Sequence, residues 1–460
     1  MDRRDFLRRG LGVAASVVVV TDGLASCGGT ASFQPGPDGW IQLPGILAEI
    51  IPPVFPANDF NVLHYGAVAN GKTGCKAAFA AAIAACHTAG GGRVVVPAGT
   101  YLIDGPIHLL SNVNLYLEAG ATIRFSAVPE DYLPLVEVRW QGIRCMNYSP
   151  FIYAYQQENI AVTGSGTIDG QQQKVWGAWA GIQNPDWLQL QQMAQDAVSV
   201  TQRLFGTGHY LRPGLFEPYD CQNILVEGVT FQGSAFWTIH PTFCSNVTIQ
   251  GVIVLPGGLN DDGCDPESCQ NVLIKDCSFQ TNDDNISLKA GLHLDITDRD
   301  TCSNIVIQNC KGQSDWSAFT MGSQTDASIS NVFIEDCVAS NCIAAYYIKT
   351  NSAIGGSVEN IYIRNSHAIT CHHLLLIETD TFGVTNGPYP PHIQNIQMDS
   401  ITCQDCSVMA FDIIGDPRVP IEGVYLSNIA IESAKALAGI DNTRNLQTTE
   451  ITLDGRIVHV

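Results

Sequence analysis

The sequence is poor in charged side chains, and basic residues are the scarcer kind. Charged residues make up 15% of its 460 positions, and 23 Lys and Arg residues stand against 44 Asp and Glu residues, which gives a formal net charge of −21. This balance argues against a nucleic-acid-binding protein, because phosphate backbones require a basic face. It also provides no long-range attraction for an anionic polymer, so an acidic substrate has to be held by local cations.

The apolar run near the N-terminus, at positions 11–20, is too short to span a bilayer. It follows an Arg pair at positions 3 and 4, and together they resemble a bacterial twin-arginine signal. Residues 24–27 then resemble a lipobox, in which Cys27 becomes the lipidated first residue of the mature protein; cleavage nearby without a lipid is the alternative. We predict that residues 1–27 are a signal peptide, that the protein is periplasmic or anchored to a bacterial outer membrane, and that it contacts membrane only through that lipid.

Sixteen cysteines in an exported protein ordinarily indicate disulfides. Two observations favour free thiols instead. A twin-arginine substrate folds in the reducing cytoplasm before export, and Cys277, Cys310 and Cys337 each follow a repeated Asn by six residues, so they should stack as small buried hydrophobes. The sequence has no pair of CxxC motifs with zinc spacing, and we interpret the lone CxxC at 403–406 as structural. We expect no metal and no other cofactor.

Residues 28–58 are rich in Gly and Pro and predict a tether or an extended strap. A helical pattern follows at 76–89 and ends at three consecutive glycines. One helix before a long array of short strands is what the open end of a solenoid requires. We assign residues 59–460 to a single domain and expect no helix-length periodic run inside the array, although residues 171–205 form a long insertion.

A repeated motif, Asn followed by alternating aliphatic residues, runs through the array. Its Asn residues are at positions 159, 223, 246, 271, 304, 331, 360 and 395. Asn223 and Asn246 are 23 residues apart and Asn271 and Asn304 are 33 apart, which is the length of one solenoid coil. The Asn amide fits a turn where it can bond its copy in the next coil. The pattern predicts an all-β, right-handed parallel β-helix with a short N-terminal capping helix.

Two polar segments, 260–266 and 281–285, each follow a repeated strand and contain Asp262, Asp283 and Asp284. Such residues cluster in ordinary turns as well. Equivalent positions of adjacent coils, however, lie ~4.8 Å apart, so we expect the three carboxylates on one face. Glycoside hydrolysis requires such a set, with one carboxyl protonated to donate to the leaving oxygen and another ionised to activate water. A separation of ~6.5–9.5 Å leaves room for that water and favours inversion.

These segments resemble signatures of the polygalacturonase family, glycoside hydrolase family 28, from about residue 60 to beyond residue 400. The family motifs are NTD, GDD, GHG and RIK. In this sequence residues 260–262 read NDD where NTD is expected, and residues 282–284 read NDD where GDD is expected. The resemblance implies a pectin-lyase-like β-helix. It also implies that Asp283 is the general acid, and that Asp262 and Asp284 hold and deprotonate water.

The other two signatures are altered. Trp316, Ser317 and an Ala stand where GHG is expected, and Tyr347 replaces the Arg of RIK while Lys349 remains. Arg binds a sugar carboxylate in a bidentate manner that Tyr cannot reproduce. A Tyr or Trp instead offers a stacking face and a donor, which suits a neutral sugar or a differently placed uronate. We expect Trp316, Ser317, Tyr347 and Lys349 to bind substrate and to lie in one column with the carboxylates.

Two further residues complete the predicted site. Lys289 matches a Lys that is usual in the family, and beside Asp283 and Asp284 it either tunes them or pairs with one structurally. His240 occurs near the cleft in the resembling sequences and is assigned to substrate binding, although a lone His is commonly structural. Asp265 is expected behind the catalytic groups.

The sequence therefore predicts an exported, monomeric, inverting glycoside hydrolase that acts on pectic or related plant-type polysaccharides, with a branched or non-standard uronate or a neutral sugar at the linkage. Two alternatives stay open. A non-catalytic glycan-binding solenoid is consistent with the missing His and Arg, and a polysaccharide lyase would need a base beside the sugar C5 and usually calcium. Endo or exo action depends on whether the loops at 171–205 and 380–392 close one end of the groove.

Overall fold

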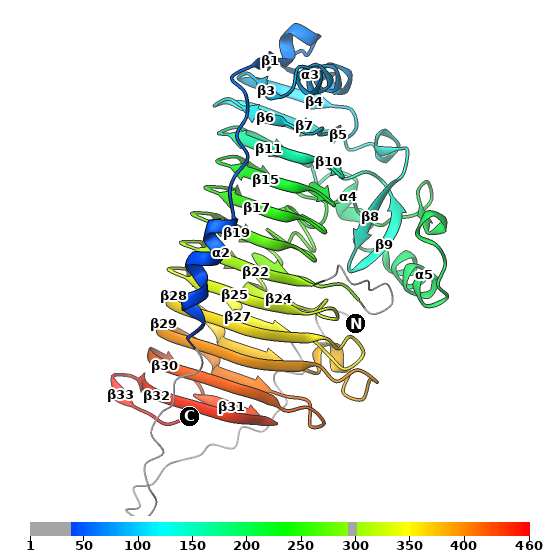
Figure 1. Ribbon diagram of the computed structural model, residues 1–460. Helices are drawn as coiled ribbons and strands as arrows, with labels where there is room; N and C mark the ends of the chain where they lie inside the picture. The colour runs from blue at the N-terminus through cyan, green and yellow to red at the C-terminus, as the bar shows by residue number, and fades with distance from the viewer. Residues whose placement is uncertain (1–37, 293–300) are drawn as a thin grey trace, which may run out of the picture.

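The computed structural model describes residues 38–292 and 301–460. The predicted signal peptide, Cys27 and the first part of the predicted strap lie outside the described residues. The chain winds into stacked coils whose strands pair in parallel with those of the next coil, and α3 covers the N-terminal end of the stack (Figure 1). The predicted right-handed parallel β-helix with a capping helix is confirmed. The helix predicted at 76–89 is α3 (Lys76–Thr88).

Three columns of strands make up the walls of the coils. The first contains β1 (Asp59–Asn61), β3 (Gly92–Val96), β6 (Val113–Leu117), β11 (Glu158–Gly164), β15 (Gln222–Glu227), β17 (Ser245–Gln250), β19 (Gln270–Lys275), β22 (Cys302–Gln308) and β25 (Ile329–Glu335). The second contains β2 (Asn70–Gly74), β4 (Gly99–Ile103), β7 (Ala121–Phe125), β12 (Thr167–Asp169), β16 (Thr230–Gln232), β18 (Ile253–Val254), β20 (Ser278–Thr281), β23 (Lys311–Ser314) and β26 (Val338–Ser340). The third contains β5 (Ile107–His108), β10 (Ile152–Tyr155), β14 (Phe216–Tyr219), β21 (Ile286–Leu288), β24 (Ser317–Gly322) and β27 (Cys342–Lys349).

Longer strands close the C-terminal end, and shorter elements project from the coils. The last coils are β28 (Ser357–Glu378), β29 (His392–Ile414), β30 (Ile421–Ala434), β31 (Ala438–Asp441), β32 (Thr443–Leu453) and β33 (Arg456–Ile457). Outside the columns lie β8 (Val136–Trp140), β9 (Ile143–Asn147), β13 (Leu204–Phe205), α2 (Leu43–Glu49), α4 (Trp176–Trp179), α5 (Asn184–Gln195), η1 (Gly39–Gln42), η2 (Val62–Tyr65), η3 (Pro129–Tyr132), η4 (Val200–Gln202) and η6 (Thr381–Gly383). None of the helices in the described part of the chain has the length and apolarity to cross a membrane.

The repeated Asn residues form the predicted ladder along the stack. Asn304 has a φ of 58°, a left-handed conformation that Asn tolerates better than most residues. Its amide donates to Asn271 Oδ1 at 2.9 Å, and Asn331 donates to Asn304 Oδ1 at 3.1 Å. The same bond links most other successive members of the series. Each Asn therefore both shapes its own turn and joins two coils.

Free cysteines fill the interior, as predicted. Every described cysteine is buried and unbridged, and the thiol of Cys310 lies between those of Cys277 and Cys337. The two cysteines of the CxxC motif at 403–406 join Cys371, with sulfur separations of 3.3, 3.7 and 4.0 Å.

Three α-helices of the described residues, α2, the one-turn α4 and α5, were not predicted. The described part of the strap is not extended throughout, because α2 packs its buried residues Leu43 and Ile46 on Phe333 and Tyr362 of the solenoid flank. The expectation of no helix within the array is wrong at α5. That helix is held by a small separate core around Leu190.

Candidate active site

The third column of strands brings the two acidic segments into register. Cys264 bridges Ile286 of β21 in parallel, and Ile286 pairs with Phe319 of β24. Asp262 and Asp284 each precede these paired residues by two positions. They therefore occupy the same place in adjacent coils, at the point where the turn enters the strand.

The three predicted carboxylates converge at the floor of a cleft of about 680 Å³. One carboxylate oxygen from each of Asp262, Asp283 and Asp284 lies within 4.8 Å of the others. This is closer than the expected ~6.5–9.5 Å, because two of the residues are adjacent in one turn and the third is one coil away. The spacing thus leaves the inference of inversion without support from geometry.

The carboxylates of the cluster have different hydrogen-bond and ion-pair partners. Asp284 Oδ2 accepts from Lys349 Nζ at 2.6 Å and from Ser287 Oγ at 3.1 Å. Asp262 Oδ2 lies 3.6 Å from Lys289 Nζ. Burial, followed by the charges of neighbouring carboxylates, raises the pKa of Asp262 well above its ordinary value. The cluster therefore retains a proton more readily than isolated carboxyls do.

Asp261 positions the second acidic turn, a role that the sequence argument missed. Its carboxylate accepts from the backbone N–H groups of Asn282 at 2.9 Å, Asp283 at 3.0 Å and Gly257 at 2.7 Å. The residue thus ties the turns of two coils together directly beneath Asp283. The signal available in the sequence was its departure from the middle Thr of the NTD motif.

Four of the predicted substrate-binding residues line the cleft: Lys289, Trp316, Tyr347 and Lys349. Ser317, which was also assigned to substrate binding, is not among the residues that line the cleft; it is the first residue of β24 and is fully buried. Both lysines are engaged with carboxylates, as their ion pairs show.

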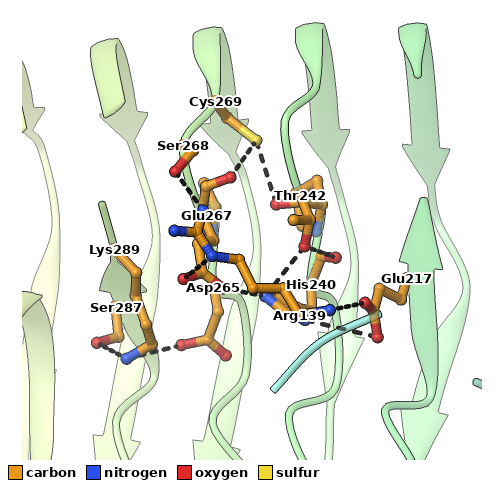
Figure 2. A network of polar contacts seen from close by, with 12 residues as sticks. Arg139, Glu217, His240, Thr242, Asp265, Glu267, Ser268, Cys269, Ser287 and Lys289 are labelled. Atoms are coloured by element: carbon orange, nitrogen blue, oxygen red, sulfur yellow. Dashed lines mark hydrogen bonds and ion pairs between the residues drawn. The ribbon is translucent and has the colours of Figure 1, made fainter. Parts of the chain in front are cut away.

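His240, also assigned to substrate binding, is buried and is not among the residues that line the cleft. Its Nε2 lies 2.8 Å from Glu267 and its Nδ1 lies 3.7 Å from Glu217, and Trp237, which lines the cleft, packs edge-on against its ring. Figure 2 shows the imidazole between the two glutamates, with Arg139 beside Glu267. Burial opposes protonation, but the hydrogen bonds and charges of the two glutamates outweigh it and raise the pKa of His240 to about 9.

Aromatic side chains from both predicted loops form the walls of the cleft. Trp187 comes from α5 in the 171–205 insertion, and Phe382 and Tyr389 come from the segment after β28. Trp237 and Trp316 contribute from the coils themselves. Flat apolar side chains with a few polar groups between them are what a sugar-binding cleft uses to hold the faces of sugar rings.

Three convergent carboxylates are also the ligand type that hard cations prefer. Here, however, the ammonium groups of Lys349 and Lys289 lie within ion-pair distance of Asp284 and Asp262 and balance much of their charge. We therefore assign no metal to this cluster.

A family model described as glycosyl hydrolases family 28 matches residues 86–450 of the chain. The chain belongs to this family. It is therefore a glycoside hydrolase, and the three carboxylates occupy the cleft of a family 28 β-helix.

Individual relatives agree with this assignment. A probable polygalacturonase from Vitis vinifera is 27% identical over 395 residues, which are 82% of this chain and 75% of that protein. An exo-poly-alpha-D-galacturonosidase from Dickeya chrysanthemi is 26% identical and covers 83% of this chain and 68% of its own length. The crystal structure of an exopolygalacturonase from Thermotoga maritima superimposes with a TM-score of 0.83 at 32% identity, over 91% of this chain and 96% of that one.

One departure from the family 28 pattern has a structural counterpart. Tyr347, in place of the Arg of RIK, is buried and its hydroxyl donates to a carboxylate oxygen of Glu378. Burial is the main cause that raises the pKa of Glu378 to about 7, with Asp380 and Asp412 adding to it. A carboxyl group that was not identified from the sequence thus lies behind Tyr347.

Proposed function

We propose that this family 28 enzyme hydrolyses glycosidic bonds of pectic polysaccharides with Asp262, Asp283 and Asp284. The observation that carries the proposal is the convergence of these three carboxylates at the floor of an aromatic-walled cleft. The polygalacturonases and exo-poly-alpha-D-galacturonosidase among its relatives support a pectic substrate.

Asp283 acts as the general acid in this proposal. It is the most exposed of the three, at 8% against 3% for Asp262 and 1% for Asp284, so it has the best access to a leaving oxygen in the cleft. Asp284 has its charge paired with Lys349 and, together with Asp262, holds the water that attacks the anomeric carbon. Asp283 gives its proton to the glycosidic oxygen as that bond breaks, and the water loses a proton to one of the other two carboxylates. Single displacement by this water inverts the configuration.

Replacement of Asp283 by Asn tests this assignment. We expect kcat to fall by roughly 10²–10⁴-fold, because the acid can no longer transfer a proton, while glycan binding is retained in affinity electrophoresis. The matched control is Asp315→Asn, at an exposed position of the next coil. A D283N enzyme with undiminished turnover would contradict the role.

The products separate the remaining alternatives. Proton NMR of the first products should show the inverted anomer from wild-type enzyme. Unsaturated, ultraviolet-absorbing products would identify a lyase instead. Binding without any release of reducing ends, unchanged in D283N, would identify a glycan-binding solenoid.

We further propose that the sugar beside Tyr347 is a neutral residue or a branched or otherwise non-standard uronate. A plain uronate there meets a hydroxyl that is already bonded to Glu378 and a lysine that is already paired with Asp284. A tyrosine cannot replace the bidentate contact that arginine makes with a carboxylate. Initial rates on homogalacturonan, rhamnogalacturonan, xylogalacturonan and neutral plant polysaccharides test this, and homogalacturonan as the best substrate would refute it.

We also propose export by the twin-arginine route, with residues 1–27 as signal and Cys27 as the lipid-bearing residue. A polymeric substrate that cannot enter the cytoplasm supports it. Replacement of the Arg pair at 3 and 4 by Lys should retain the protein in the cytoplasm. Replacement of Cys27 by Ser should free it from the membrane fraction, and a lipid-free wild-type protein would contradict the anchor.

A further inference from the structure

Lys289 lines the cleft but is almost fully buried, with its ammonium group among the carboxylates. Its Nζ is 2.8 Å from Ser287 Oγ, 3.2 Å from Asp265 Oδ1 and 3.6 Å from Asp262 Oδ2. The ring of Trp237 covers it, with its centroid 4.6 Å from Nζ, and only 3% of the residue is exposed. Lys289 is therefore poorly placed to bind substrate and well placed to act on the acids around it.

Asp262 is surrounded mainly by negative charge. Asp265, Asp283 and Asp284 all oppose its ionisation, and Lys289 is the cation that counters them. Its Oδ1 is buried and, among the described residues, has no hydrogen-bond partner. The charge state of Asp262 thus depends strongly on how much of the Lys289 charge it experiences.

Asp265 competes for the same ammonium group. It is fully buried, lies 3.2 Å from Lys289 Nζ, and is closer to it than Asp262 is. Figure 2 shows Lys289 reaching Asp265 from the neighbouring coil, beside Ser287. Burial raises the pKa of Asp265 to about 7, against the pull of Lys289 and then of His240.

Further charged side chains lie behind this pair. Arg139 and His240 face Glu267, and His240 also faces Glu217, so positive and negative side chains alternate on the side away from the cleft. The charge of Lys289 also helps to lower the pKa of Glu267. Lys289 therefore interacts with a charge behind it as well as with Asp265 and Asp262.

We propose that Lys289 and Asp265 form a positioning pair that sets the ionisation of Asp262 and with it the acid limb of the pH–rate profile. The pair touches no substrate. The inference rests on the proposed role of Asp262 in activating water. In functional terms, Lys289 promotes the charged form of Asp262, and Asp265 weakens that effect by sharing the ammonium group.

The two members of the pair should move the profile in opposite directions. Lys289→Met removes the positive charge, so the acid limb of kcat should move to higher pH by roughly one unit or more. Asp265→Asn releases the ammonium to Asp262, so the limb should move to lower pH. Lys289→Arg should restore much of the wild-type profile. The matched control is Arg364→Met, which removes an ion pair of 2.6 Å to Glu335 on the solenoid flank and should leave the profile unchanged.

Opposite shifts are a result that loss of packing does not produce. Shifts in one direction for both variants, or folded variants with no shift, would overturn the positioning role. An enzyme that hydrolyses no glycan would refute the proposed function instead. In that case the pKa of Asp262, followed by carbon-13 NMR of labelled aspartates, should still rise in Lys289→Met and fall in Asp265→Asn if the pair acts as inferred.

Discussion

Replacement of Asn304 by Ala tests how the ladder stabilises the solenoid. The substitution removes the hydrogen bonds to Asn271 at 2.9 Å and from Asn331 at 3.1 Å, which contribute about 1 kcal/mol each. It also places Ala at a φ of 58°, a conformation that costs about 1–2 kcal/mol for residues other than Gly and Asn. We expect the free energy of unfolding to fall by about 3 kcal/mol in total.

Urea unfolding followed by circular dichroism measures the loss. Amide hydrogen exchange shows which coils lose stability. A coil depends mainly on its two neighbours, so exchange should accelerate first in the coil of Asn304 and in the coils on either side of it. Asn304→Gly separates the two causes, since Gly adopts this conformation freely and loses only the bonds. Equal destabilisation by Ala and Gly would refute the backbone part of the reasoning. Full stability of both variants would refute the ladder's contribution altogether.

Three further predictions concern the site and the residues around it. The raised pKa of Glu378, about 7 against an ordinary 4.5, means that the folded protein binds this proton more tightly than the unfolded chain. Stability should therefore fall as pH rises from about 4.5 to about 7, and Glu378→Gln should flatten that slope in thermal melts. The double variant Tyr347→Arg, Glu378→Gln restores a guanidinium without its competing carboxylate, so KM for homogalacturonan should fall roughly tenfold; an unchanged KM would show that this position does not contact the sugar. Gly291→Ala should destabilise the protein by roughly 2 kcal/mol or more, because its φ is 70° and a Cβ there would overlap Arg139 Nη2, and an unchanged melting temperature would contradict this.

Much of the fold follows from short-range pattern in the sequence. The Asn motif identifies both the turn residue and the strand behind it, and its spacing identifies the coil. The helix at 76–89 has the periodicity and glycine stop that α3 shows. In contrast, α2 and α5 pack against distant coils and loops, and no local window of the sequence contains those contacts.

The sequence by itself determined the coil, the ladder and the three carboxylates, because each depends on residues that recur at a fixed distance along the chain. Only the tertiary structure decided where side chains point. Asp284 and Ser317 occupy equivalent repeat positions, but Asp284 lines the cleft from a turn, whereas Ser317 is the first residue of a strand and is not among the residues that line the cleft. The burial of His240 and the partners of Lys289 and Tyr347 likewise depend on residues that lie far away in the chain. The stacking of the coils sets the direction and the charge environment of each side chain. The spacing of residues along the chain contains no information about that stacking.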